Sequence, residues 1–76
     1  MTNRKNQLTF FVNGSETHVD EIVIAVSDLI KSLGLNPQRL AVELNRRIIR
    51  RAEWDSTRIS EGDTVEIVHF VGGGKE

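Results

Sequence analysis

The chain has 76 residues, of which 38% are apolar and 28% charged, with a formal net charge of -1 and no cysteine. A chain of this length forms one domain with a modest core, which leaves no room for a classical enzyme cleft. The composition excludes thiol chemistry, disulfides and thiolate metal sites, and it gives no sign of bulk affinity for nucleic acid or membranes.

The N-terminal segment, residues 1–7, is polar, and no apolar signal-peptide segment follows it. The longest apolar run, residues 22–26, is far shorter than the ~20 residues that span a bilayer. We therefore expect a cytoplasmic protein that does not insert into a membrane.

A β-hairpin is predicted near the N-terminus. Leu8 to Val12 is apolar and β-prone, and Glu16 to Val19 alternates polar and apolar residues. Between them, Asn13-Gly14 is the dipeptide most typical of a type I′ turn.

An amphipathic helix is predicted next. Gly34 supplies its C-terminal stop, and Asn36-Pro37 enforces a turn after it. The buried stripe of this helix is expected to consist of apolar residues spaced i, i+3, i+4 and i+7, namely Val26, Leu29, Ile30 and Leu33.

The second half of the chain shows three further β-like segments. Residues 40–44 alternate as a strand with one buried face, Asn45-Arg46 is a tight turn, and residues 47–50 form a short return strand. An irregular stretch around Trp54 follows, with this tryptophan expected at the edge of the core or anchoring a loop. Residues 60–63 signal another turn, and residues 64–71 form the longest strand.

The predicted order is strand, strand, helix, strand, short strand and long strand. One helix covers one face of a mixed sheet, so the first hairpin and the last strand must pack together beneath it. The expected fold is α+β: a β-grasp, ubiquitin-like sheet of four to five strands on one main helix, with the last strand parallel to the first. Residues 1–71 form this single domain, and residues 72–76 form a flexible tail.

The tail carries the clearest chemical signal in the chain. Gly72, Gly73 and Gly74 follow a strand directly, so they are expected to project from the domain and to fit a channel too narrow for larger residues. The glycines alone equally fit a plain chain end.

The C-terminal segment resembles that of the ThiS family, the sulfur carriers of thiamine biosynthesis. The resemblance is most specific over Glu66 to Gly74, and it extends to residues 61–65, the turn into the last strand, and to residues 42–45, the central strand. It covers roughly Leu8 to Gly74 and strengthens the β-grasp prediction.

The resemblance implies that the chain is a protein co-substrate and not an enzyme. A ThiF-type adenylyltransferase would use ATP to activate the carboxylate of Gly74, and a sulfur donor such as cysteine desulfurase would convert it to a thiocarboxylate. Thiazole synthase would then receive the sulfur. No cofactor is expected on the carrier itself, because the partner binds the ATP.

Lys75 and Glu76 depart from the family pattern, whose carriers end on glycine. Three explanations fit: a peptidase trims a pro-form after Gly74, the two residues are additions outside the natural protein, or the chain has lost the carrier role. With Gly74 internal, an amide stands where the reactive carboxylate should be, so the untrimmed chain is expected to be inactive.

Alternation along the last strand places Val65 and Ile67 toward the core, with Glu66, Val68 and Phe70 on the other side. Exposed apolar clusters often mark interfaces. Val68 and Phe70, beside the tail, are therefore predicted to dock the adenylating partner.

The remaining candidate residues have simpler interpretations. A basic cluster lies close to acidic residues and lacks interleaved aromatic residues, so a solvated surface is favoured over a nucleic-acid site; its members are Arg46, Arg47, Arg50 and Arg51. His18 and His69 are the only histidines, and without cysteine they do not predict a metal site. His69 is expected to pack or hydrogen-bond on its strand.

Two other functions remain open at this level. One is a related carrier of the molybdopterin type or a ubiquitin-like modifier, which differs in the enzyme that accepts the tail. The other is a non-carrier β-grasp binding module whose glycines are only an end. Deleting residues 72–76 would leave the function of such a module unchanged.

Overall fold

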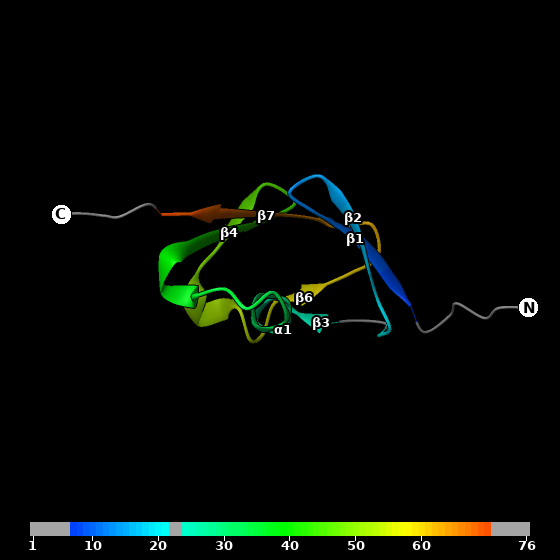
Figure 1. Ribbon diagram of the computed structural model, residues 1–76, viewed down its shortest axis with the longest axis horizontal. Coiled ribbons are helices and arrows are strands. Elements are labelled where there is room, and N and C mark those ends of the chain that lie inside the picture. Colours follow the sequence, from blue (N-terminus) through cyan, green and yellow to red (C-terminus); the bar gives the residue numbers. More distant parts are fainter. Residues whose placement is uncertain (1–6, 22–23, 71–76) are drawn as a thin grey trace, which may run out of the picture.

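The computed structural model describes residues 7–21 and 24–70 (Figure 1). In chain order the elements are β1 (Leu8–Val12), β2 (Ser15–Val19), β3 (Ile24–Ala25), α1 (Val26–Ser32), the 3₁₀ turn η1 (Pro37–Arg39), β4 (Leu40–Leu44), β5 (Arg47–Ile49), the 3₁₀ turn η2 (Arg51–Glu53), β6 (Arg58–Ile59) and β7 (Thr64–His69).

The predicted N-terminal hairpin is confirmed. Strands β1 and β2 pair antiparallel, with Leu8 opposite Val19 and Val12 opposite Ser15. Asn13 and Gly14 join them with φ angles of 49° and 84°. Positive φ at both central residues is the signature of the type I′ turn, whose twist matches that of the strands.

The helix α1 ends one residue earlier than the apolar spacing suggests. Val26, Leu29 and Ile30 are buried, but Leu33 is 46% exposed, so the prediction that it completes the buried stripe is wrong. Leu33 is the C-cap of the helix, where the chain already turns away from the core. Gly34 follows with φ +70° and donates to the Lys31 carbonyl, which confirms it as the stop.

The start of α1 is capped largely by a distant loop. The amides of Val26 and Ser27 donate to the carbonyls of Thr57 and Trp54, at 2.9 and 3.2 Å. These bonds satisfy donors that a helix leaves unpaired at its first turn. They also fasten the irregular segment after β5 to the helix.

Trp54 lies deeper than the predicted core edge. It is only 4% exposed, and its indole nitrogen donates to the Ile49 carbonyl at 3.0 Å. The single polar atom of a large apolar ring is thereby satisfied, so the residue both fills the core and anchors its loop.

The main sheet has the order β2-β1-β7-β4-β5. Strands β1 and β7 are parallel at its centre, while β4 pairs antiparallel with both β7 and β5. A five-stranded mixed sheet with one helix across it confirms the predicted β-grasp arrangement. A second, two-stranded sheet of β3 and β6 was not predicted, because two residues per strand are too few to show an alternation.

The core lies between the sheet and α1, which is seen end-on beneath the sheet in Figure 1. Its buried cluster draws on both layers: Leu8, Phe10, Ile24, Val26, Leu29, Ile30, Leu40, Val42, Trp54, Ile59, Val65 and Ile67. Of the described helices, none combines the length and apolar character of a membrane span. No described element covers the opposite face of the sheet (Figure 1), which is called the outer face below.

Candidate functional site

The last strand, β7, has two chemically different faces. Val65 and Ile67 are 0% and 7% exposed and contribute to the core, whereas Val68 and Phe70 are 52% and 55% exposed. The predicted alternation is therefore confirmed. The docking role of Val68 and Phe70 stays a prediction at this point.

Hydrogen bonds hold the chain in place up to the last described residue. Strand β4 pairs with β7 from Leu44 opposite Val65 to Leu40 opposite His69. Beyond that pair, the amide of Phe70 donates to the Arg39 carbonyl at 2.8 Å. The backbone is thus fixed to within two positions of Gly72.

On the β1 side of β7, an asparagine side chain makes hydrogen bonds to β7 where β1 no longer pairs with it. Parallel pairing between β1 and β7 covers two residue pairs, Phe11 with Thr64 and Val12 with Val65. Past that point Asn13 accepts from the Ile67 amide at 2.7 Å and donates to the Ile67 carbonyl at 3.1 Å. One side-chain amide therefore satisfies both backbone groups of Ile67, as a neighbouring strand would.

A second asparagine fixes the start of β7. The Asn45 amide donates to the Thr64 carbonyl at 2.8 Å, and its side-chain oxygen accepts from the Thr64 amide at 2.9 Å. Its φ is 51° and that of Arg46 is 71°, which confirms the predicted tight turn before β5. In each of the two turns, the asparagine at the first central position thus hydrogen-bonds to β7 through its side chain. Sequence reasoning found the turns but missed this use, which depends on tertiary contact.

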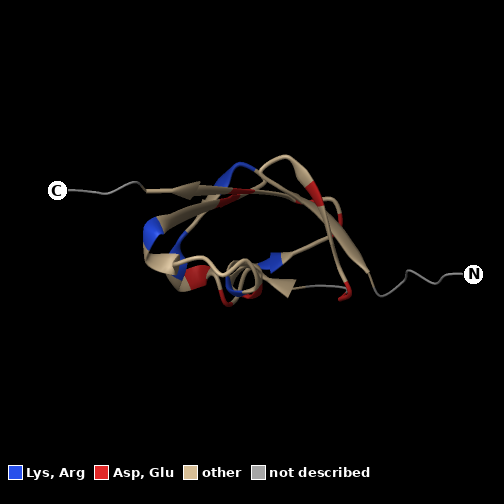
Figure 2. Ribbon diagram, in the orientation of Figure 1, with Lys and Arg blue, Asp and Glu red and all other residues tan. Residues whose placement is uncertain are grey.

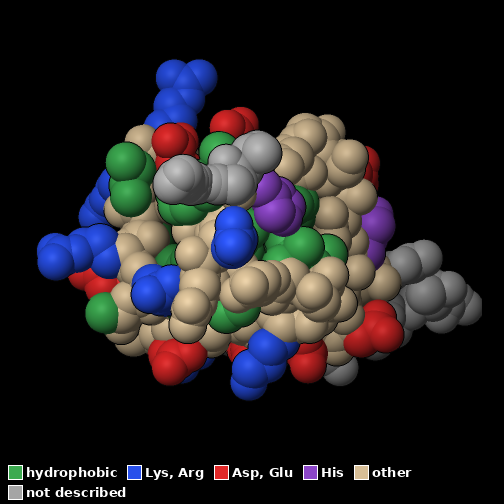
Figure 3. Space-filling view, turned by 60° about the vertical axis from the view of Figure 1, so that its left-hand side comes forward, with side chains coloured by type: hydrophobic (Ala, Val, Ile, Leu, Met, Phe, Trp, Pro, Cys, Tyr) green, Lys and Arg blue, Asp and Glu red, His purple; other side chains and the backbone are tan. Residues whose placement is uncertain are grey.

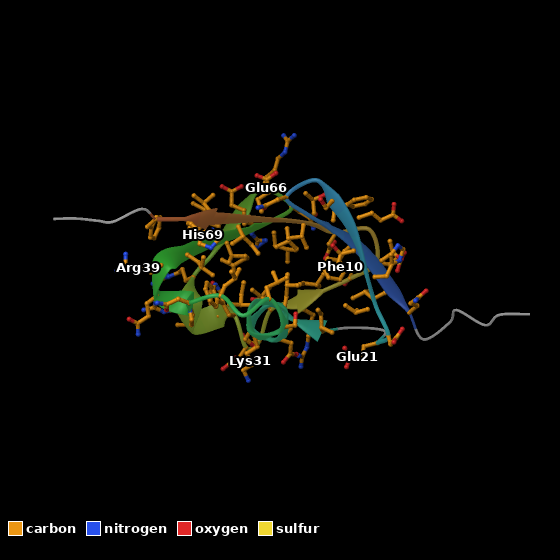
Figure 4. All side chains as sticks on the ribbon, viewed as in Figure 1. Phe10, Glu21, Lys31, Arg39, Glu66 and His69 are labelled. Carbon is orange, nitrogen blue, oxygen red and sulfur yellow. The ribbon has the colours of Figure 1, made fainter. Side chains whose placement is uncertain are left out.

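The two histidines lie apart. His69 is exposed on the inner side of β7 and Glu66 on its outer side (Figure 4), while His18 lies on β2, hydrogen-bonded to Thr9 and paired with Glu16. No hydrogen bond links the His69 side chain to another part of the described structure, so the predicted hydrogen bond is not seen, while the predicted packing stays a prediction. Within residues 7–21 and 24–70, no three histidine, aspartate or glutamate side chains gather as a metal site.

The four arginines of the predicted basic cluster are divided between the two ends of β5. Arg46 lies in the turn before β5 and Arg47 is its first residue, whereas Arg50 and Arg51 follow the other end of that strand. Figure 2 shows the basic segments separated along the chain and interspersed with acidic ones. Arg51 donates to the Pro37 carbonyl at 3.2 Å, so it also serves to tie two loops together.

The chemically important tail, Gly72, Gly73 and Gly74, lies outside the described residues, as do Val71, Lys75 and Glu76. The described structure therefore defines the surface from which this tail begins. Space-filling Figure 3 shows apolar side chains interleaved with charged ones at this end of the molecule.

Two further apolar residues on the outer face escaped sequence reasoning. Phe11 on β1 is 37% exposed and Ile48 on β5 is 69% exposed. Alternation within Arg47-Ile48-Ile49 could have shown that only one of two adjacent isoleucines faces the core. The exposed apolar surface thus extends sideways from β7 across the sheet.

Together, the small β-grasp fold and the strand leading into a glycine tail define a ubiquitin-like carrier or modifier class. The ThiS family model matches residues 5–74, nearly the whole chain. The sulfur carrier protein ThiS of Bacillus subtilis is 33% identical over 63 residues, covering 83% of this chain and 96% of that protein. This chain therefore belongs to the ThiS family.

Two further comparisons extend this result. A thiazole synthase of Magnetococcus marinus is 36% identical over 64 residues, which cover 84% of this chain but 19% of that enzyme. The chain thus spans about a fifth of that relative's length. The crystal structure of a thiamine biosynthesis protein (ThiS) from Geobacter metallireducens superposes with a TM-score of 0.79 at 33% identity, covering 88% of this chain and all of that one.

Proposed function

We propose that this chain is a sulfur carrier for thiamine biosynthesis that works through the carboxylate of Gly74. The observation that carries the proposal is the family match, which runs to residue 74, the last of the three glycines. It is supported by the backbone after β7, where the Phe70 amide donates to the Arg39 carbonyl and fixes the chain two positions before Gly72.

The chemistry consists of two substitutions. A carboxylate oxygen of Gly74 attacks the α-phosphorus of ATP, forming an acyl adenylate and releasing pyrophosphate. Sulfide then attacks the acyl carbon, AMP leaves, and a thiocarboxylate remains. In the cell a cysteine desulfurase or another donor supplies the sulfur. A persulfide donor attacks the acyl carbon in the same way and forms an acyl disulfide, whose S–S bond a thiol then cleaves to leave the thiocarboxylate and a new disulfide.

This division of labour suits the small size of the chain. An acyl adenylate is hydrolysed by water, so it must be formed inside a partner's site that orients the reactants and excludes solvent. Glycines lack a Cβ and allow close approach of the partner's backbone. The carrier supplies the reactive end, and a ThiF-type adenylyltransferase supplies the catalysis and binds the ATP.

Docking of this partner is assigned to Val68 and Phe70. Both are more than half exposed and lie on one face of the chain just before the tail. Apolar residues are rarely left exposed as a group unless a partner covers them. Docking there would bring the tail to the enzyme at high effective concentration.

Thiazole synthase is proposed as the acceptor of the sulfur. The support is the thiazole synthase of Magnetococcus marinus, part of whose chain is similar to almost all of this one. A carrier-like domain inside such an enzyme indicates that the two work together. This observation favours thiamine over molybdopterin biosynthesis.

Removal of Lys75 and Glu76 is a necessary step in this proposal, because only then does Gly74 bear a free carboxylate. A peptidase of the cell would perform it where the two residues belong to the natural protein. We expect the mature carrier to act in the cytoplasm, without binding nucleic acid or a membrane.

Intact mass spectrometry tests the proposal. A chain ending at Gly74 is incubated with a ThiF-type adenylyltransferase, ATP and sulfide, with the 76-residue chain as the matched control. The shorter chain should gain the mass of an oxygen-to-sulfur exchange, and the longer chain should not. If the shorter chain is never modified, the carrier function is wrong and a binding module is the better hypothesis.

A further inference from the structure

The outer face of β4, β5 and β7 is an exposed apolar surface with two acidic residues at its centre. Val68 lies opposite Ala41 across the β4–β7 pair, and Ile48 lies opposite Glu43 across the β4–β5 pair. Opposite residues of an antiparallel pair share a face, so these side chains form one surface. Three described strands contribute to it.

The two acidic residues, Glu43 and Glu66, lie directly opposite each other across β4 and β7. Figure 4 shows Glu66 projecting from the outer side of the sheet, away from α1. Directly opposite side chains have Cβ atoms only about 4.5–5.5 Å apart, and like charges in this arrangement are destabilising. The pairing therefore costs the isolated domain some stability.

No described cation lies within ion-pair distance of either carboxylate. The one ion pair within the described ranges joins His18 and Glu16 on β2, so Glu43 and Glu66 have none there. Arg46 lines the same shallow hollow as the two carboxylates, together with Asn45 and Thr64, but it is not within ion-pair distance of either.

We propose that this face binds the adenylating partner through an arginine side chain of that partner, placed between Glu43 and Glu66. The inference rests on the proposed function and extends it by naming the chemistry of the contact. A guanidinium presents several donors in a rigid fork that suits carboxylate geometry. Its weak hydration suits a place flanked by Val68 and Ile48, where an ammonium would be held less well.

The negative charge of Glu43 and Glu66 disfavours other molecules that could bind to this face. A second copy of the chain, related by a two-fold axis, would bring the same acidic pair against this one if the face paired with itself. Nucleic acid and anionic lipid surfaces would be repelled by the carboxylates. A basic side chain of a protein partner removes the repulsion within the sheet and also steers association.

The test measures binding and stability on the same variants. Glu43→Gln, Glu66→Gln and the double variant are made in a chain ending at Gly74, which keeps every described element. Titration calorimetry gives the Kd for a ThiF-type adenylyltransferase, and denaturant unfolding gives the stability. The matched control is Glu16→Gln, which removes an outer-face carboxylate from β2, away from the hollow.

We expect the double variant to bind at least about tenfold more weakly, with a flatter dependence on salt, while it unfolds no more easily than the original chain. A substitution that relieves repulsion yet weakens binding is not explained by a structural role. Glu16→Gln should leave the Kd unchanged.

Unchanged binding by the double variant would overturn the inference. Easier unfolding of both the double variant and Arg46→Gln would also overturn it. In that case the carboxylates would stabilise the domain through an ion pair with Arg46. The proposed function fails separately: a chain that binds in a glutamate-dependent manner but is never adenylated keeps this contact and loses the carrier chemistry. If the original chain does not bind the enzyme at all, the contact is wrong.

Discussion

The two faces of the segment from Val65 to Phe70 differ sharply in exposure. On the inner face Val65 and Ile67 are buried in the core, while on the outer face Val68 and Phe70 are more than half exposed. From Val65 to Val68, successive residues of the strand thus alternate between packing in the core and facing outward. The comparison teaches that one segment carries both core contacts and the exposed surface that we propose binds the partner, one residue apart.

The largest effect is expected from deleting the tail that follows β7, and not from a substitution on either face. A chain lacking residues 72–76 should lose all thiocarboxylate formation, because it has no Gly74 carboxylate, yet keep its unfolding transition. Mass spectrometry and circular dichroism measure the two properties. Retained activity would show that the reactive group lies elsewhere, and lost folding would place the tail in the core.

The next prediction compares the two faces directly. Ile67→Ala should lower the free energy of unfolding by about 2–5 kcal/mol, because it leaves a cavity in a packed core. Val68→Ala, one residue further along, should change it by no more than about 0.5 kcal/mol. Denaturant unfolding measures both changes in free energy. Equal losses of stability would mean that the outer face also stabilises the fold.

The outer face should show its role in partner binding. Phe70→Ser in a chain ending at Gly74 should raise the KM for a ThiF-type adenylyltransferase about tenfold, since large aromatic side chains often dominate interfaces. The stability should be unchanged. Leu33→Ser is a matched control, because Leu33 is similarly exposed but lies at the end of α1. An equal rise in KM for both would argue against a specific docking site.

The last prediction concerns the Asn13 side chain, which hydrogen-bonds to β7. Asn13→Gly keeps the positive φ of the turn but removes both hydrogen bonds to Ile67, which should cost about 1–2 kcal/mol of stability. Asn13→Asp keeps the acceptor and loses the donor, so its loss should be smaller. Chemical denaturation gives the ranking, and a reversed order would contradict the described bonds.

Much of this fold follows from local patterns in the sequence. The hairpin turn at Asn13-Gly14, the helix stop at Gly34 and the alternation along β7 each arise from the backbone preferences of a few residues. Three features did not follow from these patterns: the exposure of Leu33, the two short strands β3 and β6, and the deep burial of Trp54. Their positions depend on where distant segments pack, and a two-residue strand carries no period.

The features of the candidate site also divide into those that local patterns predict and those that depend on distant segments. Exposure of Val68 and Phe70 was predictable from alternation, and the role proposed for Gly74 rests on the family resemblance. The opposition of Glu43 and Glu66 depends on the pairing register of strands 23 positions apart in the chain, which single-sequence patterns do not give. The amide contacts of Asn13 and Asn45 with β7 depend on the same register.

The exchange of labelled pyrophosphate into ATP tests the central claim most directly, because it reports adenylation of Gly74 without any later step. With a ThiF-type adenylyltransferase, a chain ending at Gly74 should support exchange, whereas the 76-residue chain, whose Gly74 carbonyl is an amide, should not. Exchange with neither chain, or equal exchange with both, would contradict the account.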